Sequence, residues 1–183
     1  MSLTRDFLNN FQNFMHDHVL LVPAQVAPKD GQFKLQAQGN HAAVVENSNS
    51  QSDINGYYVH PVANNDNVYA LPTQQDETYY MLTDTMNGCQ FIAYGPDRQH
   101  VTVEHNNYIG NPANYALRLA AIQAQNPAYI WHISAAAADN IVGGTYDPAH
   151  GINLVGTYDQ QNGWRFWVRE RVDQNQGQIY GPF

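Results

Sequence analysis

Cysteine and charge are both scarce in this sequence. Of its 183 residues one is cysteine and only 13% are charged, whereas 43% are hydrophobic. A single cysteine excludes an internal disulfide, so the fold must depend on its core. The apolar content can supply such a core, and the charge is too low for a disordered chain. The length indicates one domain that spans residues 1–183.

Long hydrophobic runs and positive charge are lacking too. No apolar run approaches the roughly 18 residues that a membrane-spanning helix needs. The amino-terminal residues have no recognisable signal peptide, because a basic segment followed by an apolar one is missing. The net charge of −8 disfavours nucleic acid as the main partner, since phosphate backbones are repelled. Metal-ligand spacings and glycine-rich phosphate loops are missing as well, so we expect no metal and no organic cofactor.

Two helices are predicted. Apolar residues recur at helical spacing over residues 4–16, and Thr4 is the expected cap. The second helix has Asn111 as its expected cap and Pro112 in its first turn, and it ends at Asn126-Pro127.

Strand patterns fill most of the remaining chain. Residues 47–55 are predicted to form a polar loop. The segment Gly-Thr-Tyr-Asp occurs twice, beginning at Gly144 and at Gly156. We interpret the two copies as successive strands of a meander. We predict an α/β (α+β) fold, a β-sandwich-like arrangement of packed mixed sheets flanked by two helices. The predicted strands, rich in β-branched and aromatic residues and bounded by turn residues, are Gln32–Gln38, Tyr57–His60, Val68–Leu71, Thr78–Thr83, Cys89–Tyr94, Val101–His105, Tyr129–Ser134, Ile141–Tyr146, Ile152–Tyr158 and Trp164–Val172.

The single cysteine lies in a context that favours catalysis over a purely structural role. A lone cysteine is most often a small buried hydrophobic residue. Cys89, however, follows the turn signal Asn87-Gly88 and precedes a strand signal, so we expect it at the mouth of a strand. Backbone amides of Gly88 and Cys89 beside such a turn can hold an oxyanion. Asn87 is a secondary candidate for the same site.

A nucleophilic cysteine also needs a base, because an ordinary thiol is only slightly ionised at neutral pH. The strand predicted over residues 101–105 forms a hairpin with the strand that begins at Cys89. Alternation places His105 on the same face as Val101 and Val103. We therefore predict His105 as the base. His100, on the opposite face and nearer the turn, is the second candidate.

These residues resemble the active-site layout of bacterial toxin glutamine deamidases, the family of the cytotoxic necrotizing factor catalytic domain and Burkholderia lethal factor. The family pattern is Leu-Ser-Gly-Cys, followed about one hairpin later by a catalytic histidine. Cys89 matches the nucleophile, Gly88 the glycine and His105 the base. Met86-Asn87 stands where the family has Leu-Ser.

The resemblance extends to a third residue that orients the histidine. Thr83, six residues before the cysteine, matches that position in the lethal factor. Thr85 is an alternative, because both threonines point to the same side if the strand continues. The firm resemblance covers about 25 residues around Cys89 and His105.

The resemblance implies a function for the whole chain. It implies a cofactor-free protein-glutamine deamidase that acts on a host protein with an exposed glutamine, either a translation-initiation helicase or a Rho-type GTPase. The protein would be a bacterial effector, secreted or delivered to the host cytosol, and a monomer. Two alternatives stay open. One is a Cys-His peptidase or transglutaminase, and the other is a non-catalytic binding module whose contact surface includes Trp164, Phe166 and Trp167, with Trp167 exposed.

Overall fold

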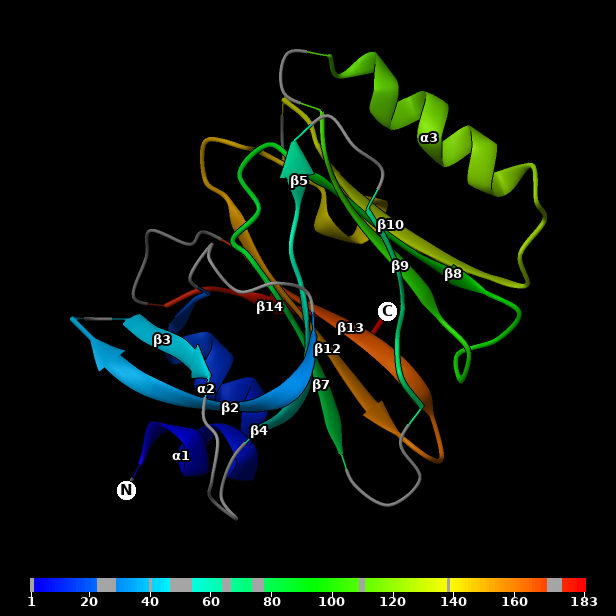
Figure 1. Ribbon diagram of the computed structural model, residues 1–183. Coiled ribbons are helices and arrows are strands. Elements are labelled where there is room, and N and C mark those ends of the chain that lie inside the picture. The colour runs from blue at the N-terminus through cyan, green and yellow to red at the C-terminus, as the bar shows by residue number, and fades with distance from the viewer. Residues whose placement is uncertain are drawn as a thin grey trace.

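Two β-sheets and three α-helices make up the described part of the chain in the computed structural model (Figure 1). The structure describes residues 2–22, 29–39, 41–46, 54–63, 67–73, 78–108, 111–137, 139–170 and 176–183. The larger sheet has eight strands in the spatial order β1 (Val19–Leu21), β3 (His41–Glu46), β2 (Lys29–Gln38), β4 (Ile54–Val59), β7 (Tyr79–Thr83), β12 (Ile152–Asp159), β13 (Gly163–Glu170) and β14 (Ile179–Tyr180). The smaller sheet has the order β11 (Thr145–Tyr146), β10 (Tyr129–Ala135), β8 (Gln90–Gly95), β9 (Thr102–Asn107) and β5 (Val62–Ala63), and β6 (Val68–Ala70) also pairs with β9.

The main core lies between the two sheets. Alternation along β7 turns Met81 toward the smaller sheet, whereas Tyr80 and Leu82 point to the opposite side. From the smaller sheet, buried side chains of β8, β9 and β10 complete this core. The predicted α+β class with packed mixed sheets is therefore confirmed. The core between the sheets includes Met81, Leu154 and Phe166 from the larger sheet and Phe91, Val103 and Ile133 from the smaller sheet.

The helices cover the outer faces of the sheets (Figure 1). Helices α1 (Leu3–Asn9) and α2 (Phe11–Asp17) form a second core with the outer face of the larger sheet. Helix α3 (Ala113–Gln123) lies against the smaller sheet, where Arg118 donates to both carboxylate oxygens of the buried Glu104 at 2.7 and 2.5 Å. Among the described residues, no helix has the length and apolar character required to cross a bilayer.

The helix ends differ from the prediction. The helix expected over residues 4–16 is broken at Asn10, whose backbone leaves the helical region (φ −152°, ψ 69°) and whose side chain caps α2. Ser2 caps α1, whereas Thr4 is buried and accepts a hydrogen bond from the Leu35 amide at 2.9 Å. In α3 the cap position is taken by Pro112, with no side-chain capping bond. Three helices therefore stand where two were predicted.

The strand predicted over Ile141–Tyr146 is wrong in its first half. Ile141–Gly143 forms a 3₁₀ turn, capped by the Asn140 side chain, and only Thr145–Tyr146 pairs as a strand. The two Gly-Thr-Tyr-Asp segments do not form a meander, because β11 and β12 belong to different sheets. Residues 47–53 of the predicted polar loop and the end of the last predicted strand lie outside the described residues, and β4 already begins at Ile54.

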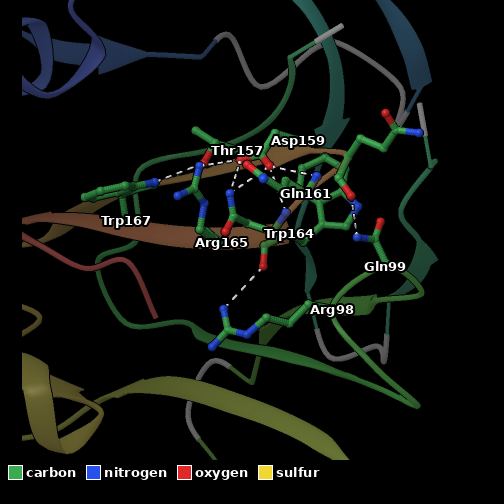
Figure 2. A network of polar contacts seen from close by, with 10 residues as sticks. Arg98, Gln99, Thr157, Asp159, Gln161, Trp164, Arg165 and Trp167 are labelled. Carbon is green, nitrogen blue, oxygen red and sulfur yellow. Dashed lines mark hydrogen bonds and ion pairs between the residues drawn. The ribbon is translucent and has the colours of Figure 1, made fainter. Parts of the chain in front are cut away.

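A polar network closes the end of the β12–β13 hairpin (Figure 2). Asp159 accepts hydrogen bonds from the backbone amides of Gln161 at 3.1 Å and Asn162 at 2.8 Å. Its second oxygen accepts from Arg165 at 2.6 Å. Arg98, from the turn after β8, exchanges hydrogen bonds with the backbone of Trp164. These contacts tie the turn between β8 and β9 to the larger sheet.

Candidate active site

The β8–β9 hairpin places the predicted nucleophile and base on one face. In the antiparallel register Phe91 lies opposite His105, and Gln90 lies opposite Asn106. Cys89 immediately precedes β8, so alternation sends its side chain to the same face as Phe91. Cys89 and His105 are thus diagonal neighbours across the two strands, a relation that long side chains can bridge.

This face is the inner one. Val101, Val103 and His105 are 2%, 0% and 0% exposed. Met81 of the larger sheet belongs to the same buried cluster as Cys89, and Thr83 is two residues further along that strand on the same face. The imidazole is therefore a polar group inside the core that joins the two sheets.

Thr83 is the threonine that contacts the imidazole. Its Oγ1 lies 2.6 Å from His105 Nδ1 and donates its own proton to the Val59 carbonyl at 2.7 Å. Because that proton is already committed, Thr83 must accept a hydrogen bond from Nδ1–H of a neutral His105. The proton-free ring nitrogen is then Nε2. It is buried and has no hydrogen-bond partner among the described residues.

The two alternative candidates, Thr85 for the orienting residue and His100 for the base, lie elsewhere. Thr85 follows the end of β7, and its Oγ1 accepts from the Asn153 side chain at 3.1 Å. His100 is exposed, and its ring pairs with the Asp97 carboxylate at 3.0 Å. The structure therefore places Thr83 beside His105, and it separates Thr85 and His100 from this group.

Burial shifts the pKa values of both key groups toward their neutral forms. The pKa of the Cys89 thiol is raised to about 11, mainly by burial and also by the Asp84 carboxylate, while a backbone hydrogen bond from Asn87 acts in the opposite direction. The pKa of His105 is lowered to about 3, mainly by burial and also by the nearby His60. At neutral pH the resting site therefore holds a thiol and a neutral imidazole, not a thiolate–imidazolium pair.

A cavity of about 540 Å³ opens at Cys89. Cys89 is 5% exposed, belongs to the buried cluster and also lines this cavity, so the residue lies at the border between the core and the cavity. The lining contains no charged side chain among the described residues, which suits a neutral ligand group better than an ionised one. It consists of Asn87, Gly88, Cys89, Asn107, Tyr108, Pro112, Tyr115, Ala135, Ala136, Ala137 and Pro148.

One of the two predicted oxyanion donors is already engaged. The Gly88 amide donates to the hydroxyl of Tyr146 at 3.0 Å, so the prediction that it holds an oxyanion is not supported. A neighbouring buried side chain has taken that hydrogen bond, which sequence spacing could not reveal. The Cys89 amide remains the candidate donor. The exposed Asn87 also lines the cavity and can supply a side-chain amide.

Further polar side chains, which the sequence analysis did not propose as site residues, lie close to Cys89 and His105. His60 and Asp84 follow directly after the paired residues Val59 and Thr83, and their side chains contact each other at 2.8 Å. Tyr58 donates to the second oxygen of Asp84 at 2.5 Å. Tyr115 of α3 and Tyr146 of β11 both contact the backbone at Gly88.

The aromatic surface suggested for a binding module is not formed by the predicted residues. Trp164 and Phe166 are fully buried, and Trp167 is 8% exposed with its indole nitrogen donating to Thr157 at 3.1 Å. The expectation that Trp167 is exposed is therefore wrong.

Within the described ranges, no group of three or more His, Cys, Asp or Glu side chains could hold a metal ion.

Comparison with known proteins adds no family to this picture. No protein-family model matches the chain, and no curated protein matches it significantly. The resemblance to toxin deamidases therefore rests on the residues around Cys89 and His105 alone.

Proposed function

We propose that this protein is a protein-glutamine deamidase of the bacterial toxin type, which converts a glutamine of a host protein to glutamate. The observation that carries the proposal is the Thr83–His105 contact, which leaves Nε2 as the basic atom on the face that Cys89 shares. The cavity at Cys89 provides access for a neutral carboxamide. A translation-initiation helicase or a Rho-type GTPase is the proposed target class.

In the first half of the reaction, His105 Nε2 takes the proton of the Cys89 thiol as the sulfur attacks the carboxamide carbon of the glutamine. The carbon–oxygen double bond becomes a single bond, and the Cys89 amide donates to the resulting oxyanion. His105 then returns the proton to the amide nitrogen. The carbon–nitrogen bond breaks, and ammonia and a thioester are formed.

In the second half, water attacks the thioester carbon while His105 Nε2 takes one of its protons. The carbon–sulfur bond breaks, the sulfur takes the proton back from His105, and the product is glutamate. Thr83 holds the imidazole with its proton on Nδ1 throughout, the orienting role of the third member of a triad. Since the resting groups are neutral, attack and proton transfer must be concerted or closely coupled.

The test is a search for deamidated glutamine after incubation with a human cell extract and with a library of short peptides, each with one glutamine. We expect ammonia release and a mass increase of about 1 Da at individual glutamines. Cys89→Ser should abolish both signals with an unchanged circular dichroism spectrum. Equal signals from the wild-type protein and Cys89→Ser would overturn the proposal.

The same experiment separates the rival reactions of this cysteine. A peptidase would produce fragments in place of the mass increase. A transglutaminase would attach an added primary amine, such as methylamine, to the glutamine. Papain-like hydrolases place their cysteine at a helix N-terminus, where the helix dipole lowers the thiol pKa. Cys89 instead precedes a strand, which counts against a papain-like arrangement.

A further inference from the structure

Two tyrosine hydroxyls contact the short backbone segment that carries the nucleophile. Tyr115 comes from α3 and donates to the carbonyl oxygen of Gly88. Tyr146 comes from β11, accepts from the Gly88 amide at 3.0 Å and donates to the Cys89 carbonyl at 2.9 Å. Elements that are far apart in the sequence thus meet at Gly88 and Cys89.

The Tyr115 contact fixes the direction of the amide that would hold the oxyanion. The Gly88 carbonyl and the Cys89 amide belong to one peptide unit, and in a planar trans peptide these two groups point in opposite directions. A hydrogen bond that holds the carbonyl therefore also holds the N–H bond. Tyr115 is itself fixed, because its hydroxyl accepts from the Tyr108 amide at 3.2 Å.

The Tyr146 contact anchors the two ends of the same peptide unit. Its ring is fully buried, and its hydroxyl bridges the amide before this unit and the carbonyl after it. The Ala135 amide donates to the Cys89 carbonyl as well, at 3.3 Å. Gly88 has φ +135°, a region that glycine enters easily, so its own dihedral preference does not hold this orientation.

We propose that Tyr115 and Tyr146 are positioning residues that set the direction of the Cys89 amide for the tetrahedral intermediate. This inference rests on the proposed attack of Cys89 on a carbonyl carbon. It assigns a task to two hydroxyl groups whose rings would pack equally well as phenylalanine. Tyr→Phe variants therefore separate the hydrogen bonds from the packing.

The probe is an N-acetylated glutamine analogue in which an aldehyde replaces the side-chain carboxamide. The sulfur of Cys89 adds to the aldehyde carbon, the carbonyl π bond breaks, and the thiol proton ends on the oxygen. The hemithioacetal imitates the tetrahedral intermediate and depends on the same oxyanion donor. Alkylation by iodoacetamide needs the thiolate but no oxyanion donor, so it serves as the reference reaction.

We expect Tyr115→Phe and Tyr146→Phe each to weaken the aldehyde adduct about tenfold or more, with an iodoacetamide rate within about twofold of the wild-type rate. Tyr158→Phe is the matched control. Its buried hydroxyl donates to Gln99 at 2.6 Å, close to the turn at the opposite end of the β8–β9 hairpin, and its loss should leave both reactions unchanged.

A spectroscopic readout follows from the single cysteine. Labelling with ¹⁵N-cysteine gives one amide resonance, that of Cys89. We expect this resonance to shift in Tyr115→Phe and in Tyr146→Phe before any probe is added, and to stay in place in Tyr158→Phe. The shift reports the peptide orientation even if a variant is less stable.

Three results would overturn this inference and leave the proposed function standing. Adduct affinities equal to that of the wild-type protein would do so, as would an unmoved amide resonance in both variants. Parallel losses in adduct formation and alkylation would show that the hydroxyls only keep the thiol accessible. If the wild-type protein and Cys89→Ala bind the aldehyde equally, Cys89 forms no covalent adduct with it. The proposed function then fails, and this inference fails with it.

Discussion

The two ends of the β8–β9 hairpin each carry a histidine, and the two histidines have opposite surroundings. At the turn, His100 is exposed and pairs with Asp97, and the nearby polar network of Arg98 and Asp159 also lies near solvent (Figure 2). At the other end, His105 is fully buried, donates to Thr83 and has an Nε2 without a partner among the described residues.

The comparison indicates that neither histidine makes a polar contact that adds much stability to the fold. Exposed ion pairs such as His100–Asp97 contribute little to stability because water and salt screen them. A buried nitrogen without a hydrogen-bond partner lowers the free energy of unfolding by about 1–3 kcal/mol. Such a group is explained either by a function or by a bound water molecule. Substitutions at the two ends can test this contrast.

The largest expected effect is that of His105→Gln. Loss of the base should lower kcat for deamidation by about 10²- to 10⁴-fold, because no other described imidazole shares the inner face of the hairpin. His100→Gln is the matched control and should change kcat by less than about twofold. Deamidation of the peptides modified by the wild-type protein measures both, and equal losses would remove the contrast between the two ends.

A smaller effect is expected on the reactivity of the thiol. Because the pKa of Cys89 is raised from 9.0 to about 11, the native protein near pH 8 should react with iodoacetamide about a hundredfold more slowly than the urea-unfolded chain. The native rate should rise up to about pH 11. A native rate that matches the unfolded rate near pH 8 would contradict the buried position of the sulfur.

Removal of the hydroxyl that orients His105 should have the next largest effect. Thr83→Val leaves Nδ1–H without its acceptor and should lower kcat about tenfold, with KM nearly unchanged. Thr85→Val has a similar shape change but removes only a bond from Asn153, so its kcat should stay close to the wild-type value. The reverse ranking would assign the orienting role to Thr85.

A last predicted effect is on stability and not on a rate. His105 has a pKa near 3 in the native state and near 6.5 when unfolded, so between these values the unfolded chain binds more protons. Its contribution is therefore complete above about pH 6.5 and is lost as the pH falls, by at most about 1.4 kcal/mol per pH unit. Urea unfolding from pH 7 to pH 4 should show a steeper pH dependence for wild type than for His105→Gln. Parallel slopes would contradict the pKa of His105.

Much of the fold could be predicted because local patterns agree with it. The hairpin of β8 and β9 was correctly predicted from turn residues at both ends, and alternation correctly placed His105 on the same face as Val101 and Val103. The errors occur where tertiary contacts override local signals. Thr4 resembles a cap but its hydroxyl accepts from Leu35 of β2, and Ile141 has a strand composition but begins a 3₁₀ turn.

The candidate site was predictable only in part, for the same reason. The spacing of Thr83 and Thr85 could not decide between them, because the decision depends on where β7 ends and on the Asn153 side chain from another strand. The engaged amide of Gly88 and the roles of Tyr115 and Tyr146 depend on contacts across at least 27 residues of sequence. No local pattern encodes such contacts.

The central claim is that His105 can take the proton of Cys89. A crystal structure of the protein measures this directly as the distance between Cys89 Sγ and His105 Nε2. We predict a distance of about 4 Å or less, or one bridging water, with Nε2 directed at the sulfur. A separation beyond about 6 Å with no bridging water, or an imidazole whose Nε2 is directed away from the sulfur, would contradict the claim.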